Sequence, residues 1–107
     1  MDLKPLVPGS KIVGPAVTIR TVPGRGDLEA LAHADDTRFP RHPEDAIDAV
    51  QPGDVMVQDG GAFVRGAIFG DLLTLRLEVR GAAGLVCDMP IRDSPRLRAQ
   101  PVPVFCR

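Results

Sequence analysis

Short apolar runs alternate with helical segments in the second half of the chain, and this alternation constrains the fold more than any other feature. Strands are expected at residues 85–87 and 103–106, with a helical turn at 94–99 between them. The best helix is expected at 67–80, where spacings of i, i+4, i+7 and i+11 predict one buried apolar face made of Ile68, Leu72, Leu75 and Val79. This order is typical of an α/β protein with parallel strand pairs.

The first half of the chain adds weaker elements. Strands are expected at 11–20 and 55–58, and short helices at 27–34 and 43–50. Gly81 is expected to end the long helix. A chain of 107 residues fits one domain, 1–107. The strand ending at Cys106 has no expected neighbour on one side, so we expect a partner subunit or further polypeptide to cover that edge.

Composition indicates a folded, soluble protein with an aliphatic core. Hydrophobic residues make up 44% and charged residues 25% of the chain, which excludes the composition of a disordered protein. There are four Phe and neither Trp nor Tyr, so Leu, Ile, Val and Ala must fill the core. No apolar stretch approaches the roughly 20 residues that span a bilayer.

The charge balance argues against nucleic-acid binding, which needs clustered Lys and Arg. The formal net charge is −1, and it is unevenly distributed along the chain. Six basic and ten acidic side chains precede Val64, whereas seven basic and four acidic ones occur from Val64 onward. This asymmetry suits head-to-tail self-association, and it is equally compatible with two ordinary solvated faces.

The cysteines and histidines form no recognisable catalytic or metal-binding motif. Cys87 and Cys106 lie in apolar runs without CxxC spacing, so we expect two small buried side chains in a reducing cytoplasm. His33 and His42 lie near carboxylates, which leaves open a metal site or an acid–base pair, with solvated side chains as the alternative.

Three charged residues stand where α/β proteins place their ligands. Asp71 lies near the start of the best helix, where free backbone N–H groups attract anions. Arg92 and Asp93 follow a buried strand, at the strand end that faces the ligand crevice in open α/β sheets. Arginine can grip a carboxylate and aspartate can bind a divalent cation. The alternative is a helix cap and a structural Arg–Asp pair.

Several segments resemble the RraA-like family, which contains regulators of ribonuclease E activity and the class II 4-hydroxy-4-methyl-2-oxoglutarate/4-carboxy-4-hydroxy-2-oxoadipate aldolases. They are KIVGPAVTIR, GDVMVQDGG, FGDLLTLRLEVRGAAGLVCDMPIRD and PVPVFCR. The most specific match is Asp71, twenty intervening residues and then Arg92-Asp93. The resemblance runs from about Leu6 to Arg107. It implies a swivelling β/β/α domain, an α-β-β-α sandwich with a mixed sheet, here shortened at both ends.

The resemblance also implies a function and a site. It makes the chain a lyase that cleaves 4-hydroxy-2-oxo acids to pyruvate, with oxaloacetate decarboxylation as a side activity. Asp93 would bind Mg²⁺, or another divalent metal such as Mn²⁺, and Asp71 would hold water bound to that metal. Arg92 would grip the pyruvate moiety. The backbone amides that would hold the same group belong to Gly70, Asp71, Leu72 and Leu73. A homotrimer or hexamer with sites between subunits is implied.

Two positions depart from the family pattern. Arg96 stands where aldolase members usually carry an acidic residue, and Asp88-Met89-Pro90 replaces a turn that usually contains Gly. These differences leave two alternatives to the aldolase hypothesis. One is a non-catalytic regulator that binds an endoribonuclease, and the other is an inactive shortened homologue.

Overall fold

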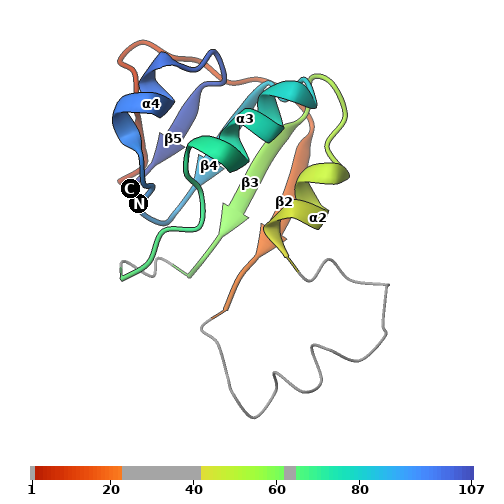
Figure 1. Ribbon diagram of the computed structural model, residues 1–107, viewed down its shortest axis with the longest axis horizontal. Helices are drawn as coiled ribbons and strands as arrows, with labels where there is room; N and C mark the ends of the chain where they lie inside the picture. The colour runs from red at the N-terminus through yellow and green to blue at the C-terminus, as the bar shows by residue number, and fades with distance from the viewer. Residues whose placement is uncertain (1, 23–41, 62–64) are drawn as a thin grey trace.

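The computed structural model describes residues 2–22, 42–61 and 65–107. Five strands form one sheet, and helices cover one of its faces (Figure 1). The strands are β1 (Lys4–Pro5), β2 (Ala16–Arg20), β3 (Val55–Asp59), β4 (Gly84–Cys87) and β5 (Val104–Cys106). The helices are α2 (Pro43–Asp48), α3 (Asp71–Val79) and α4 (Ser94–Ala99).

The sheet is mixed, with the order β1-β5-β4-β3-β2. Strands β2 to β5 run parallel in sequence order, and β1 is antiparallel to β5. The expected α/β fold with a mixed sheet is therefore confirmed. The expectation of an uncovered edge at β5 is wrong, because β1 pairs with it there. Two residues, one of them proline, form β1 and leave too short a pattern to recognise as a strand.

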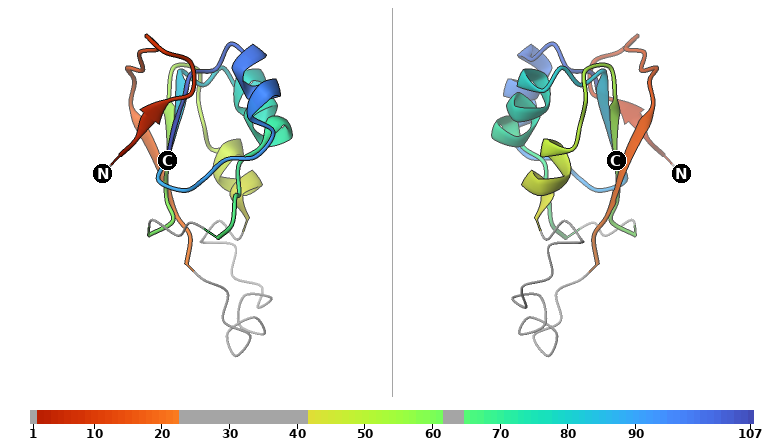
Figure 2. Two further views of the ribbon diagram at one scale, coloured as in Figure 1. Left: turned by 90° about the vertical axis from the view of Figure 1, so that its left-hand side faces the viewer. Right: turned by 90° about the vertical axis from the view of Figure 1, so that its right-hand side faces the viewer.

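The core lies between the sheet and the helices, and Figure 2 shows these two layers from both sides. Alternate residues of each strand point to the helical side, and the parallel register aligns Met56 with Leu85 and Leu85 with Val104. The largest fully buried apolar side chains are Phe69, Ile47, Met56, Leu77, Leu85 and Leu97. The expected aliphatic core is confirmed, with Phe69 as its one fully buried aromatic side chain among the described residues.

Helix α3 buries a different face from the one that its sequence spacing predicts. Leu77 and Thr74 are fully buried. Leu72, Leu75 and Val79, which were expected to face the core, are 75%, 45% and 80% exposed. The helix is apolar on both sides, so spacing alone could not show which side meets the sheet.

The ends of α3 follow local rules. Its first residue is Asp71 rather than Ala67. Its C-terminus has the predicted glycine, because Gly81 adopts a φ of 78°. The Gly81 N–H donates to the Glu78 carbonyl (2.9 Å), and the Ala82 N–H donates to the Leu77 carbonyl (3.0 Å). These two bonds form a Schellman cap, which glycine favours because it has no Cβ.

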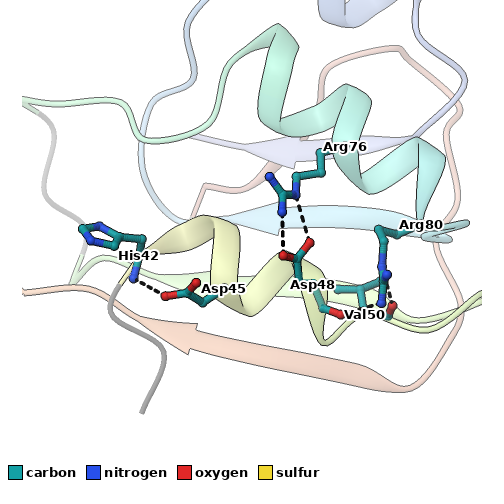
Figure 3. Close-up of polar contacts among 6 residues, drawn as sticks. All are labelled: His42, Asp45, Asp48, Val50, Arg76 and Arg80. Atoms are coloured by element: carbon teal, nitrogen blue, oxygen red, sulfur yellow. Dashed lines mark hydrogen bonds and ion pairs between the residues drawn. The ribbon is translucent and has the colours of Figure 1, made fainter. Parts of the chain in front are cut away.

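Arg76 of α3 and Arg80, the C-cap residue of α3, hold α2 in place (Figure 3). Arg76 makes a two-pronged ion pair with the carboxylate of Asp48, with Nε 3.0 Å from Oδ1 and Nη2 2.5 Å from Oδ2. The Arg80 guanidinium donates to the backbone carbonyls of Asp48 and Val50. Arg80 therefore caps the C-terminus of α2, in addition to standing at the end of its own helix.

The opposite face of the sheet carries no helix from the described ranges (Figure 2). An open apolar groove runs along this face, and residues 12–14 border it. Its floor consists of Ala16, Val55, Val57, Val86 and Phe105. Within the described part of the chain, no helix is long and apolar enough to cross a membrane.

The cysteine prediction is confirmed in its structural part. Cys87 and Cys106 are buried and form no disulfide. Burial raises the pKa of the Cys87 thiol to about 11, which keeps it protonated at neutral pH.

His42 is the exposed N-cap of α2 and donates its backbone N–H to Asp45. His33 and the helix expected at 27–34 lie outside the described residues.

The two sides of α3 should respond differently to truncation. We expect Leu77→Ala to lower the free energy of unfolding by about 2–5 kcal/mol, because it leaves a cavity in the core. Leu75→Ala should cost less than about 1 kcal/mol, because Leu75 is partly exposed. Urea unfolding at low protein concentration measures both changes. Equal losses would contradict the observed burial of α3.

Candidate functional site

Helices α3 and α4 lie side by side over the sheet, and both begin near its carboxyl edge. Helix α3 follows β3 through residues 60–70, and α4 follows β4 through residues 88–93. Because each helix returns antiparallel to the parallel strands, its N-terminus lies at the edge where the preceding strand ends. Asp71 and Asp93 therefore come from different loops to neighbouring positions.

Gly70 is the point at which the two loops meet. The Arg92 N–H donates to the Phe69 carbonyl at 3.1 Å. A Cβ at position 70 would lie 2.6 Å from Asp93 Oδ2 and 2.9 Å from Arg92 Cγ, which is closer than van der Waals contact allows. The missing side chain lets Arg92 and Asp93 pack against the start of α3. The structure thus brings together three of the residues singled out from the sequence.

Asp93 combines an unusual backbone conformation with an available carboxylate. Its φ of 59° and ψ of 31° are left-handed, a region that aspartate tolerates better than most residues. Its backbone carbonyl accepts the N–H groups of Arg96 and Leu97 at 2.9 and 3.1 Å, so it starts α4. Its side chain makes no capping hydrogen bond and lies 3.9 Å from Arg92 Nε. Helix capping therefore leaves the carboxylate available for a ligand.

Residues of α4 and of its C-cap bind Asp71. Arg96 Nη1 lies 2.7 Å from Asp71 Oδ2, and Gln100 Nε2 donates to the Asp71 carbonyl at 3.0 Å. The hydrogen bond from Arg96 is the main cause that lowers the pKa of the Asp71 carboxyl, and the backbone N–H of Leu72 lowers it further. Asp71 is thus an ionised, ion-paired carboxylate at neutral pH.

The first turn of α3 offers fewer free amides than its position suggests. The backbone N–H groups of Leu72 and Asp71 help to lower the pKa of the Asp71 carboxyl, and the Thr74 N–H bonds to the Gly70 carbonyl at 3.1 Å. Leu73 lies between them, and as a first-turn residue its N–H has no acceptor within the helix. The side chain of Leu72 is exposed and that of Leu73 packs against the core. The helix start can therefore offer an anion its dipole and the Leu73 amide.

The Asp93 carboxylate could contribute one ligand to a divalent cation. Within residues 2–22, 42–61 and 65–107, no group of three His, Cys, Asp or Glu side chains could hold a metal ion. Mg²⁺ commonly binds through one or two carboxylates, with waters and substrate oxygens completing its shell. Asp93 is a carboxylate of that kind, and its packing against Gly70 holds it at the helix start.

Two buried polar residues at the same edge were missed by sequence reasoning. Asp88 Oδ1 accepts the Gly60 N–H at 2.7 Å, which links the loop after β3 to the loop after β4. Gln58 is 2% exposed, and its Oε1 accepts the Cys87 thiol at 3.1 Å. The position of Asp88 directly after a buried strand was the available signal. Its residue type suggested a turn instead.

The complete chain, residues 1–107, matches the family model described as RraA-like: Aldolase/RraA. The chain belongs to the RraA-like family. A protein of Halalkalibacterium halodurans named "Putative 4-hydroxy-4-methyl-2-oxoglutarate aldolase" is 33% identical over 105 residues, which are 98% of this chain and 43% of that protein. Protein DlpA of Legionella pneumophila is 32% identical over 106 residues, which are 99% of this chain and 16% of DlpA.

The fold agrees with a solved member of the family. Streptomyces coelicolor RraAS2, described as an unusual member of the RNase ES inhibitor RraA protein family, superposes with a TM-score of 0.77 at 34% identity. The match covers 97% of this chain and 46% of that protein. The chain spans less than half the length of each of these three relatives. The family resemblance noted from the sequence is confirmed.

The ion pair between Arg96 and Asp71 should be visible in a titration. In Arg96→Gln, we expect the pKa of Asp71 to rise toward that of an ordinary aspartate, because its main hydrogen-bonding cation is gone. Carboxyl-carbon NMR measures this rise. Because the folded pKa is lowered, the pair stabilises the protein above the unfolded pKa of about 3.9 and loses this effect as pH falls through the folded value.

The stability difference between wild type and Arg96→Gln should therefore be present at neutral pH and close on acidification. Arg98→Gln is the matched control, because it removes an exposed arginine of the same helix. An Asp71 pKa that stays the same in Arg96→Gln would contradict the ion pair.

Proposed function

We propose that this chain forms the site of a divalent-metal-dependent lyase that cleaves 4-hydroxy-2-oxo acids, such as 4-hydroxy-4-methyl-2-oxoglutarate, to pyruvate. The junction at Gly70 carries the proposal, because it holds Arg92 and Asp93 together against the start of α3. The aldolase name of the Halalkalibacterium halodurans relative supports this reaction class.

Arg92 would bind the pyruvate end of the substrate. Its side chain is 66% exposed, so a ligand can reach the guanidinium. The planar fork of arginine matches a carboxylate and an adjacent keto oxygen. The positive end of the α3 dipole and the Leu73 amide would act on the same negative charge.

Asp93 would hold Mg²⁺ or Mn²⁺ beside that charge. A bound divalent cation supplies Lewis-acid stabilisation of developing negative charge, without a Schiff base. Arg92 supplies a fixed positive charge to the same region. The left-handed backbone of Asp93 starts α4 through its carbonyl, which keeps the carboxylate directed toward Gly70.

Cleavage breaks the bond between C3 and C4 of the substrate. The 4-hydroxyl loses its proton to water and C4 becomes the carbonyl carbon of the second product. The electrons of the C3–C4 bond pass into the enolate of pyruvate, and C3 then takes up a proton from water. The lowered pKa of Asp71 makes it a poor proton acceptor. Its role would therefore be to hold water bound to the metal, as the family resemblance implies, rather than to act as a base. Decarboxylation of oxaloacetate passes through the same enolate, and we propose it as a side activity.

Variants of the junction should separate this chemistry from folding. We expect Arg92→Ala and Asp93→Asn each to reduce Mg²⁺-dependent pyruvate formation by about a hundredfold or more. Asparagine also tolerates the left-handed backbone, so Asp93→Asn removes the charge and spares the fold. A lactate dehydrogenase-coupled assay with the hydroxy acid or oxaloacetate measures pyruvate.

Arg20→Ala is the control for these variants. Arg20 forms an exposed pair with Asp59, with 3.4 Å between Nε and Oδ2. Both residues alternate with inward-facing neighbours on their strands and so lie on the helix-free side of the sheet. The activity of Arg20→Ala should equal that of the wild type. Wild-type rates in both junction variants would sink the aldolase proposal.

Gly70→Ala tests the junction itself. The added Cβ would push away the Asp93 carboxylate and the Arg92 side chain, so we expect a loss of activity with little change in circular dichroism. If the loss acts through Asp93, Gly70→Ala combined with Asp93→Asn should be no worse than Asp93→Asn alone. Additive losses would show that Gly70 matters for another reason.

A non-catalytic regulator that binds an endoribonuclease is the second candidate. One observation favours it: Arg96, in the place of the acid usual in aldolase members, neutralises Asp71. The similarity to a member of the RNase ES inhibitor family is consistent with it. Dose-dependent inhibition of a purified RNase E-type enzyme, in a preparation that forms no pyruvate, would favour this function over the aldolase.

The oligomeric state, the ligand and the cellular location follow from the same proposal. We propose a homo-oligomer, a trimer or hexamer as the family resemblance implies, with sites between subunits and a small 2-oxo acid as ligand. The free, buried cysteines support a reducing, cytoplasmic location.

A further inference from the structure

The loop of residues 88–93 joins β4 to α4 and carries both Arg92 and Asp93. Its second half is attached to the start of α3. The Arg92 N–H donates to the Phe69 carbonyl at 3.1 Å, and the side chains of Arg92 and Asp93 pack against Gly70. These contacts hold one end of the loop. The direction from which the loop reaches Gly70 depends on how its other end is held.

The other end of the loop is attached to Gly60, the residue that follows β3. Asp88 Oδ1 accepts the Gly60 N–H at 2.7 Å. Met89 packs over the same glycine, because a Cβ at position 60 would collide with Met89 Sδ and Cγ. All three residues are buried. We call Gly60, Asp88 and Met89 the Gly60 contact.

Burial makes the Gly60 contact costly to break. A buried N–H that loses its acceptor carries the free energy of its desolvation. The Asp88 N–H also donates to the Gln58 carbonyl at 3.3 Å, which extends the pairing of β3 and β4 by one residue. Met89 Sδ lies 3.6 Å from Gln58 Nε2. Pro90 comes next in the chain and fixes its own φ. The loop therefore leaves the sheet along a restricted path toward Gly70.

We propose that Asp88 is a positioning residue, which acts through the Gly60 contact to fix Arg92 and Asp93 for the cation and the substrate. The consequence for catalysis rests on the proposed lyase function. Asp88 touches neither ligand in this proposal and acts only through the loop. Partners that orient a metal ligand from behind typically change metal affinity by about 10–100-fold when they are removed.

Amide hydrogen exchange in the full chain tests the positioning without any ligand. Asp88→Ala removes the acceptor of the Gly60 N–H, so we expect the Arg92 N–H to exchange about tenfold faster than in the wild type. The Leu85 N–H, which donates to the Pro103 carbonyl at 2.9 Å, is the reference within the sheet and should change less. Asp88→Asn keeps an acceptor oxygen and should restore most of the protection. An unchanged rate at Arg92 in Asp88→Ala would overturn the proposal.

Val50→Ala is the control for a general loss of stability. Val50 is fully buried and lies between α2 and β3, at the opposite edge of the sheet from the Gly60 contact. Its truncation should speed exchange at Leu85 at least as much as at Arg92. If Val50→Ala raised the rate at Arg92 relative to Leu85 as much as Asp88→Ala does, the role of Asp88 would be merely structural and the proposal wrong.

Gly60→Ala tests the same contact from the side of β3. The added Cβ would displace Met89, which has no free space because it is buried. We again expect faster exchange of the Arg92 N–H relative to Leu85. Exchange as slow as in the wild type would contradict the proposal, even if Asp88→Ala fails to fold.

Binding of Mn²⁺ connects the Gly60 contact with the site. Electron paramagnetic resonance measures the free ion, and Asp88→Ala should raise the Mn²⁺ dissociation constant about tenfold or more. The same variant should lower kcat for pyruvate formation. Asp88→Asn should recover most of both properties, and Val50→Ala should change neither. Faster exchange at Arg92 with unchanged Mn²⁺ affinity would overturn the proposal.

The two proposals can fail separately. A wild type that binds Mn²⁺ and forms no pyruvate would contradict the lyase function alone, because exchange at Arg92 and Mn²⁺ affinity still decide the role of Asp88. Pyruvate formation that is lost in Asp93→Asn and unchanged in Asp88→Ala would contradict the positioning role alone. A wild type that binds no Mn²⁺ would overturn both.

Discussion

The parallel order of β2, β3, β4 and β5 is the constraint on which the rest of the structure depends. Each strand pairs with the next one in the chain, so each connection has to return across the sheet. Such crossovers are almost always right-handed, and successive ones in the same direction pass over the same face. This explains why α2, α3 and α4 share one side, and why no helix of the described residues lies on the opposite side, where the apolar groove runs.

The same crossovers place the starts of α3 and α4 at one edge, and Gly70 then decides how closely their loops approach. A glycine there leaves room for Asp93 and Arg92 against the helix start. Arg96 changes the electrostatics of this edge, because it forms an ion pair with Asp71, whereas the side chain of Asp93 makes no capping hydrogen bond. The chain therefore presents an arginine, a carboxylate and a helix dipole close together.

Much of this arrangement was predictable from local pattern. The limits of α4 agree with the expected 94–99, and β3, β4 and β5 differ by one residue at most. Short apolar runs bounded by Pro and Gly define such strands clearly. The sequence also placed Asp71 near a helix start and Arg92 and Asp93 directly after a buried strand, and the structure has them there. Strand β1 was missed, because a two-residue strand exists only through its pairing with β5.

The sequence by itself determined the alternation of strands and helices from α2 to β5, the glycine cap of α3 and the positions of the charged residues at strand and helix ends, because these depend on neighbouring residues. Only the tertiary structure decided which side of α3 is buried, since Leu77 and Leu75 are equally apolar and the sheet selects between them. It also decided that Arg96 pairs with Asp71 across 25 positions. Contacts of this kind depend on how two helices pack, and no local pattern records that.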